Sequence, residues 1–177
     1  MAILEMATYG NPVLRKEAEE VKKIDGEILK IIEDMKETLM NENGVGLAAP
    51  QVGISKKIFI VELPQEKGTR RLVLLNPKIV FYSKDKDIAE EGCLSFPGVW
   101  GNVERSIKVR VKGTLLSGKP TIIEGEGMFA RVLQHEIDHL EGKLFIDYFS
   151  PEDKEKNKEK LEEILNKNRE KFGKVEV

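Results

Sequence analysis

At residues 134–142 the chain reads QHEIDHLEG, a stretch that contains both of its histidines, His135 and His139. We predict a helix over residues 128–141, because glycines precede this run and Gly142 is a natural helix stop. Residues four apart lie on one face of a helix, so both imidazoles can bind a single metal ion. Glu136 lies beside the first histidine and can take a proton from a water at that metal. A chance spacing of two structural histidines is the alternative.

The supply of donor atoms limits what else can bind the metal. The chain has 2 histidines and 1 cysteine, and a catalytic metal takes three protein ligands while one position stays open. The third ligand is therefore Cys93 or a carboxylate. Cys93 lies in EGCLS, residues 91–95, between two predicted strands. Taken alone, a single cysteine is more often a small buried apolar residue than a metal ligand.

A third stretch, GVGLAAPQVG at residues 44–53, combines two close glycines with an amide side chain. Gly44 and Gly46 would let a substrate backbone lie against the chain. Gln51 can offer its amide N–H to an oxygen that becomes negative during a reaction. The stretch lacks the ending of a phosphate loop and the glycine spacing of a dinucleotide loop. Without the other two stretches, a plain turn is the simpler interpretation.

Elsewhere short β-rich runs are interspersed with a few helices. Strands are predicted at residues 57–63, 71–75, 79–82, 103–111, 121–123 and 144–149. Within residues 103–111 one face carries Val103, Arg105, Ile107, Val109 and Val111. Further helices are predicted to begin at Asn11-Pro12, Asp25 and Ser150, which are typical N-terminal caps. Because the pattern does not repeat as regular βαβ units, the predicted fold class is α+β.

The composition is typical of a single globular domain, which we place at residues 1–177, with a charged helical tail at residues 151–177. Hydrophobic residues make up 40% and charged residues 34%, and the formal net charge is −2. This near-balance excludes the basic surplus that nucleic-acid binding requires. We expect the tail to be a solvated helix with Glu–Lys pairs four residues apart.

The location of the protein is also predicted from composition. We find no signal peptide and no apolar run long enough to span a membrane. The single cysteine excludes an intrachain disulfide. We therefore expect a cytoplasmic monomer that binds neither membrane nor nucleic acid.

Together, the three stretches resemble the signature motifs of the peptide deformylases, in the same order and at similar separations. GNPVLR at residues 10–15 is also similar to the start of that family. The resemblance covers about residues 5–150 and is specific, because three independent motifs coincide. It implies an α+β fold in which mostly antiparallel strands pack around a central metal-binding helix, with a C-terminal helix.

The resemblance implies a metal centre and a reaction. Cys93, His135 and His139 would bind one divalent ion, with water as the fourth ligand. The ion would be Fe²⁺, which Zn²⁺, Ni²⁺ or Co²⁺ can replace. The reaction would be hydrolysis of the N-formyl group from the formyl-methionine of nascent polypeptides, with release of formate. Its partners would be these formylated peptides and, transiently, the ribosome.

The resemblance also implies roles around the metal. Glu136 would be the general base and then the acid. The Leu94 backbone N–H and the Gln51 side chain would stabilise the oxyanion, and Gly46 would bind the substrate backbone.

An apolar pocket for methionine is predicted from helical spacing. Met128 and Val132 fall on the face of the predicted helix that carries His135. Val45 would form the opposite wall. We expect the stem of Arg131 to pack at the rim while its head stays in water. Ordinary core packing is the alternative for Met128 and Val132.

Two other functions are compatible with parts of the pattern. A zinc endopeptidase shares the His-Glu-x-x-His spacing, but it would use a downstream carboxylate as third ligand and leave Cys93 without a role. A catalytically dead, ribosome-associated binding module would not need Cys93, Glu136 and both histidines intact. Turnover of a formyl-methionyl peptide by the metal-loaded protein separates all three.

Overall fold

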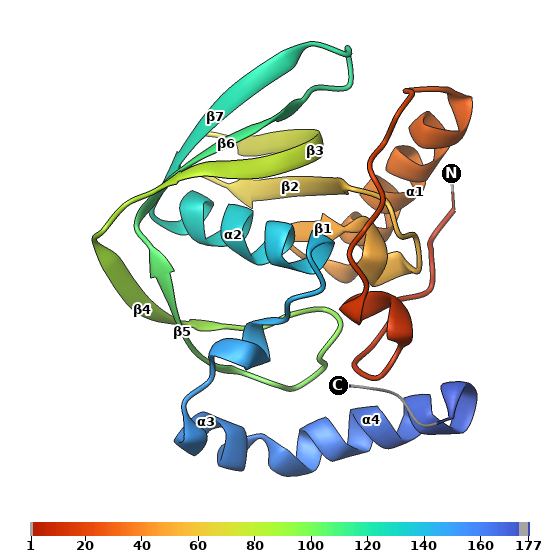
Figure 1. The fold of residues 1–177 in the computed structure, drawn as a ribbon, viewed down its shortest axis with the longest axis vertical. Helices are drawn as coiled ribbons and strands as arrows, with labels where there is room; N and C mark the ends of the chain where they lie inside the picture. The colour runs from red at the N-terminus through yellow and green to blue at the C-terminus, as the bar shows by residue number, and fades with distance from the viewer. Residues whose placement is uncertain (1, 174–176) are drawn as a thin grey trace.

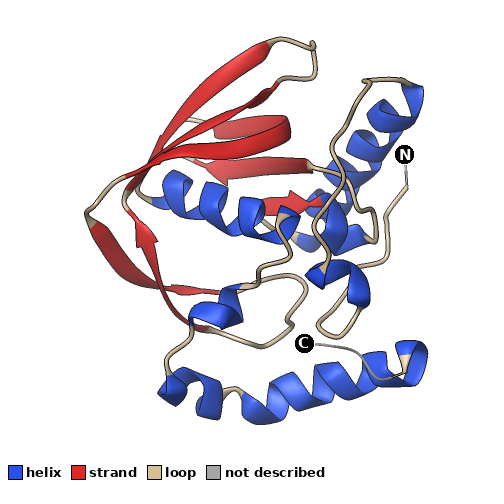
Figure 2. Ribbon diagram, viewed as in Figure 1, coloured by secondary structure: helices blue, strands red, loops and turns tan. Residues whose placement is uncertain are grey.

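The computed structural model describes residues 2–173 and 177, and it has a mixed helix and sheet architecture (Figures 1 and 2). Its strands are β1 (Gly46–Ala48), β2 (Ile58–Pro64), β3 (Thr69–Tyr82), β4 (Lys86–Glu91), β5 (Gly101–Ser106), β6 (Lys108–Thr114) and β7 (Pro120–Glu126). Its helices are η1 (Pro12–Arg15), α1 (Gly26–Glu42), η2 (Ala49–Val52), α2 (Met128–Leu140), η3 (Phe145–Tyr148), α3 (Pro151–Lys156) and α4 (Lys158–Phe172). None of the helices described in residues 2–173 has both the length and the apolar composition needed to cross a membrane.

The strands form a five-stranded sheet in the order β1-β2-β3-β6-β7 and a separate two-stranded ribbon, β4-β5. All paired strands are antiparallel. Figure 1 shows α2 lying between the larger sheet and the ribbon. The predicted α+β class, the antiparallel pairing and the central helix are therefore confirmed.

Strand β2 is buried on both faces because its side chains alternate between two helices. Phe59 and Val61 belong to the apolar cluster that includes the buried face of α2. Ile58 and Ile60 belong to the cluster of α1, which lies on the opposite face of the sheet. Side chains two apart point to the same face of a strand, so a nearly continuous apolar run is what this position requires.

Helix α2 follows the prediction closely and lies tight against the sheet. A Cβ on Gly125 would lie 2.7 Å from Leu133 Cδ1, so any larger residue would force the leucine side chain to move where β7 passes the helix. Gly142 follows the helix with a φ of +74°, the left-handed conformation expected of a glycine stop. Both histidines are thereby held at the inner side of the molecule.

Residues 103–111 do not form the single strand that was predicted. Strand β5 ends at Ser106 and β6 starts at Lys108, and the two strands belong to different sheets. The Gln134 side chain satisfies both backbone groups of Ser106, since it accepts from the N–H at 3.1 Å and donates to the carbonyl at 2.9 Å. A strand can leave one sheet for another where a side chain replaces its ladder bonds.

Two further predictions differ from the structure. Residues 71–75 and 79–82 are both strand, as predicted, but they belong to the single strand β3. The break expected at Asn76-Pro77 is a bulge within β3, where Asn76 has a φ of +51° and exchanges two 2.8 Å hydrogen bonds with the backbone of Val21. Residues 144–149 are not a strand but contain the 3₁₀ turn η3, closed by the Asp147 carboxylate on the Leu144 N–H at 3.0 Å.

The C-terminal segment is less solvated than expected. Ser150 caps α3 as predicted, through the Asp153 N–H at 3.1 Å. Helix α4 then buries Ile164, Leu165 and Asn168 against the N-terminal segment. The Asn168 amide donates to the Tyr9 carbonyl at 2.9 Å. The charged residues cover only the outer face, so the segment is part of the packed structure.

Candidate metal centre

The three predicted metal ligands converge at one point. His135 and His139 project from the same face of α2, and Cys93 comes from the loop that follows β4. One donor atom of each residue lies within 4.8 Å of the other two. The Cys93 Sγ is 3.3 Å from His139 Nε2. Donors around a tetrahedral ion at ordinary Zn–S and Zn–N lengths are about 3.5 Å apart, so this cluster fits a single divalent metal.

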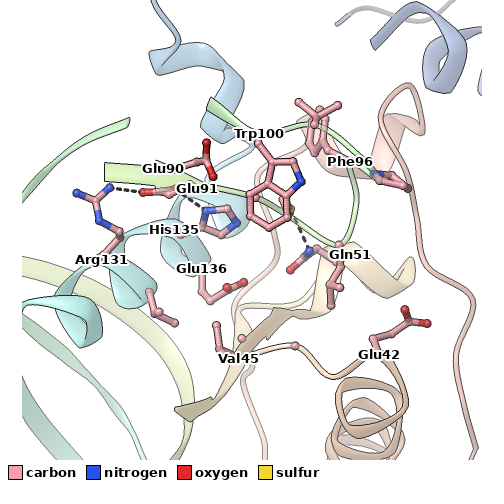
Figure 3. A pocket seen from close by; sticks show the side chains of 18 of the residues that line it. Glu42, Val45, Gln51, Glu90, Glu91, Phe96, Trp100, Arg131, His135 and Glu136 are labelled. Atoms are coloured by element: carbon pink, nitrogen blue, oxygen red, sulfur yellow. Dashed lines mark hydrogen bonds and ion pairs between the residues drawn. The ribbon is translucent and has the colours of Figure 1, made fainter. Parts of the chain in front are cut away.

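The two histidine rings differ in their hydrogen bonding and in their burial. Nδ1 of His135 lies 2.9 Å from Glu91 Oε1, which leaves Nε2 as its free donor (Figure 3). His139 is 1% exposed. Burial holds the pKa of His139 well below its usual value. Burial would also lower the pKa of His135, but the contacts with Cys93 and Glu91 raise it well above its usual value, so a metal ion has to displace the proton of this ring. A neutral imidazole is the form that binds a metal.

Glu91 joins the metal centre to two buried arginines. It accepts hydrogen bonds from Arg105 Nε and Nη2, both at 3.0 Å, and from Arg131 Nη1 at 2.6 Å, in addition to its contact with His135. Burial alone would raise the pKa of Glu91, but the bonds from His135 and Arg105 outweigh it and lower the pKa to about 2. The carboxylate is therefore ionised and orients the His135 ring.

This network corrects one prediction and adds residues that were not predicted. Arg131 does not extend its head into water, since it is 5% exposed and also binds Asp87 Oδ1 at 2.8 Å. Glu91 and Arg105 were not predicted as site residues. The sequence did indicate Arg105, because this residue falls on the apolar face of residues 103–111. A charge on a buried face requires a buried partner of opposite charge.

Glu136 projects from α2 into the cleft beside the metal cluster (Figure 3). The residue is 4% exposed, and its Oε1 is buried without a hydrogen-bond partner among the described residues. Burial raises the pKa of Glu136 to about 7. A Cβ on Gly46 would lie 2.5 Å from Glu136 Oε2, so a larger residue in β1 would displace the carboxylate.

Gln51 lies on the other side of the cysteine. Its Oε1 accepts from the Ala48 N–H at 2.9 Å, which turns Nε2 toward Cys93 Sγ at 3.4 Å and Ser95 Oγ at 3.3 Å. The amide is 2% exposed. Its donor is thus held in a fixed position beside the metal cluster.

A cleft of about 560 Å³ opens onto this cluster. Its lining includes all of the predicted site residues except His139: Val45, Gly46, Gln51, Cys93, Leu94, Met128, Val132, His135 and Glu136. Val132 is buried, whereas Val45 is 41% and Met128 61% exposed. Figure 3 shows Val45 and Glu136 on one side of the cleft and Trp100 on the other.

Comparisons with known proteins agree on one family. The sequence model described as Polypeptide deformylase matches residues 3–155. A peptide deformylase of Thermodesulfovibrio yellowstonii is 48% identical over 152 residues, which cover 85% of this chain and 92% of the relative. One of Alkalilimnicola ehrlichii is 40% identical over 176 residues, 98% of this chain and 97% of the relative. The crystal structure of a peptide deformylase from Legionella pneumophila has a TM-score of 0.85 at 40% identity, and covers 93% of this chain and 96% of that chain.

The fold and the Cys-His-His group define a metal-dependent hydrolase. The chain belongs to the polypeptide deformylase family and removes the N-formyl group from nascent polypeptides. The family and the reaction predicted from the sequence are confirmed. Neither the zinc endopeptidase nor the inactive binding module is favoured.

The Glu91 network can be tested by an isosteric change. Glu91→Gln removes the buried anion that two guanidinium groups share, and leaves Arg105 with Asp138 and Arg131 with Asp87. The free energy of unfolding should therefore fall by about 3 kcal/mol. Metal affinity should fall by about 10–100-fold, because His135 loses its orienting partner. Chemical denaturation and metal titration measure the two effects. The adjacent, exposed Glu90→Gln should change neither, and an unchanged Glu91→Gln protein would contradict the role given to this carboxylate.

Proposed function

We propose that deformylation takes place at the cluster of Cys93, His135 and His139, on peptides that begin with formyl-methionine. The observation that carries this proposal is the position of Cys93 Sγ, 3.3 Å from His139 Nε2. A His-Glu-x-x-His helix alone is also compatible with peptide-bond hydrolysis, but a thiolate third ligand beside it is the feature of the deformylase motifs. The three residues would bind the metal, which supplies Lewis-acid polarisation of the formyl oxygen and acidification of a water.

Glu136 is the proton carrier in this proposal. It takes a proton from the attacking water and passes it to the amine that leaves with the peptide, so that formate and a free N-terminus are produced. Its buried, unpaired Oε1 and its pKa of about 7 both support this role. A pKa near neutrality allows one carboxylate to accept and release the proton.

Gln51 and the Leu94 backbone N–H stabilise the oxygen that becomes negative. The Gln51 amide needs no reorganisation, because Ala48 already fixes its orientation. Donors held in place inside a buried site are worth more than the same donors in water. Leu94 directly follows the cysteine ligand and lines the cleft.

The methionine side chain occupies the apolar part of the cleft between Val45 and Val132, with the exposed Met128 at its rim. The Gly46 backbone lies along the substrate. A formyl carbon carries only hydrogen, so a crowded centre accepts it and excludes larger acyl groups.

We propose Fe²⁺ as the working ion. Zn²⁺ binds such a donor set more tightly, so the choice rests on the family resemblance. The Cys93 thiolate would donate charge to the ion and so make a bound water less acidic. An ion that readily accepts a further ligand would offset this, because it could also polarise the formyl oxygen. The setting we propose is the cytoplasm, with transient access to the ribosome and a monomeric enzyme.

Substrate choice tests the reaction directly. The metal-loaded protein should release formate from a formyl-methionyl tripeptide and should act poorly on the acetyl-methionyl analogue, because the centre is too crowded for the added methyl group. It should leave internal peptide bonds intact, as judged by mass spectrometry of the products. Efficient internal cleavage would sink the proposal.

Glu136→Gln should keep the fold and the bound metal but lower kcat by at least ~10²-fold, since the amide cannot carry the proton. Circular dichroism, metal analysis and formate release measure the three properties. Glu141→Gln, an exposed change on the same motif, is the control. Near-normal turnover by a metal-loaded Glu136→Gln protein would rule out this assignment.

The Fe²⁺ and Zn²⁺ forms of the protein should differ in rate and in their sensitivity to oxygen. Protein loaded anaerobically with Fe²⁺ should have a higher kcat/KM than protein loaded with Zn²⁺. In air the iron form should lose activity, because oxidation attacks the ion or the Cys93 thiolate, while the zinc form should keep its activity. Equal rates for the two forms would show that Fe²⁺ is not preferred.

A further inference from the structure

Trp100 is the one tryptophan of the chain and lies over the cleft. Its side chain is 56% exposed, which is unusual for so large an apolar group. The six-membered ring is pressed against Gly92, where a Cβ would lie 2.4 Å from Trp100 Cζ3. Gly92 separates the Glu91 carboxylate from the Cys93 thiolate. The indole therefore packs directly on the backbone of the metal centre and presents its remaining surface to the cleft (Figure 3).

The backbone of Trp100 is held from the C-terminal helices. Asn157, at the junction of α3 and α4, accepts from the Trp100 N–H at 3.4 Å and donates to the Trp100 carbonyl at 2.8 Å. Asp153 of α3 accepts from the Asn102 N–H at 3.0 Å. Asn157 is 6% exposed, so this pair of bonds is shielded from water. It also lies two residues beyond the part of the chain that the family model matches.

The rim position of Trp100 determines what it can contact. A peptide with its formyl group near Cys93 and Glu136 must leave the cleft past the exposed rim. There the rim carries the indole and two exposed carboxylates, Glu42 and Glu90. The carboxylates disfavour acidic residues, whereas the indole offers apolar area to bury.

We infer that Trp100 selects peptides with apolar side chains after the formyl-methionine, and that Asn157 is its positioning residue. This inference rests on the proposed function. The C-terminal helices, although remote from the chemistry, would then influence which nascent chains are processed best.

The test compares two tripeptides, formyl-Met-Leu-Leu and formyl-Met-Ala-Ala, on the metal-loaded full chain. The wild-type kcat/KM should favour the leucine peptide by roughly three- to tenfold, mainly through KM, since the contact is made in the ground state as well. Trp100→Ala should bring this ratio close to one, and Trp100→Phe should keep most of it.

Asn157→Ala should also reduce the ratio and shift the fluorescence emission of Trp100, while kcat for the alanine peptide stays within about twofold. Asn168→Ala is the matched control: it is equally buried and also sits in the C-terminal segment, but it bonds to Thr8 and Tyr9 instead. It should change neither the ratio nor the emission.

The outcomes are distinguishable. If neither peptide is deformylated, the proposed function fails. If both are deformylated and Trp100→Ala keeps the wild-type ratio, the role of Trp100 is wrong. If Asn157→Ala and Asn168→Ala behave alike in both the ratio and the emission, Asn157 does not position the indole.

Discussion

The ionised carboxylate of Glu91 is the interaction on which the rest of this site depends. It takes four hydrogen bonds, from two arginines and His135, and so joins β4, β5 and α2 at one buried point. Buried guanidinium groups are tolerated only beside such a partner. The same contact sets the His135 ring so that Nε2 is available to a metal. The Glu91 carboxylate therefore both holds these three elements together and orients a metal ligand.

Close backbone approach is the second constraint. Helix α2 lies between a sheet and a ribbon, and both must come near enough for a loop cysteine and two helical histidines to share one ion. Gly46 and Gly92 allow this, since a side chain on either would collide with Glu136 or Trp100. Both glycines make room for side chains of the site, whereas the sequence alone suggested that Gly46 makes room for the substrate.

Much of this arrangement was predictable because its determinants are local. Helix α2, its glycine stop and the spacing of its histidines follow from neighbouring residues. The strand break at Ser106 was not predictable in this way, because Gln134, far along the chain, supplies the bonds that replace the ladder. The burial of Arg131 depends likewise on Asp87 and Glu91, which belong to strand β4. The sequence of helix α4 predicts a solvated helix, because charged residues far outnumber its apolar ones. Those few apolar residues join a core cluster whose other members are distant in the sequence, so their burial was not predictable.

The central claim is that one thiolate and two imidazoles bind a single ion. X-ray absorption at the zinc edge of zinc-loaded protein tests it most directly, because sulfur and nitrogen scatter differently. We expect one sulfur at about 2.3 Å and two imidazole nitrogens at about 2.0–2.1 Å, with the sulfur absent in metal-loaded Cys93→Ala protein. A first shell without sulfur in the unmodified protein would contradict it.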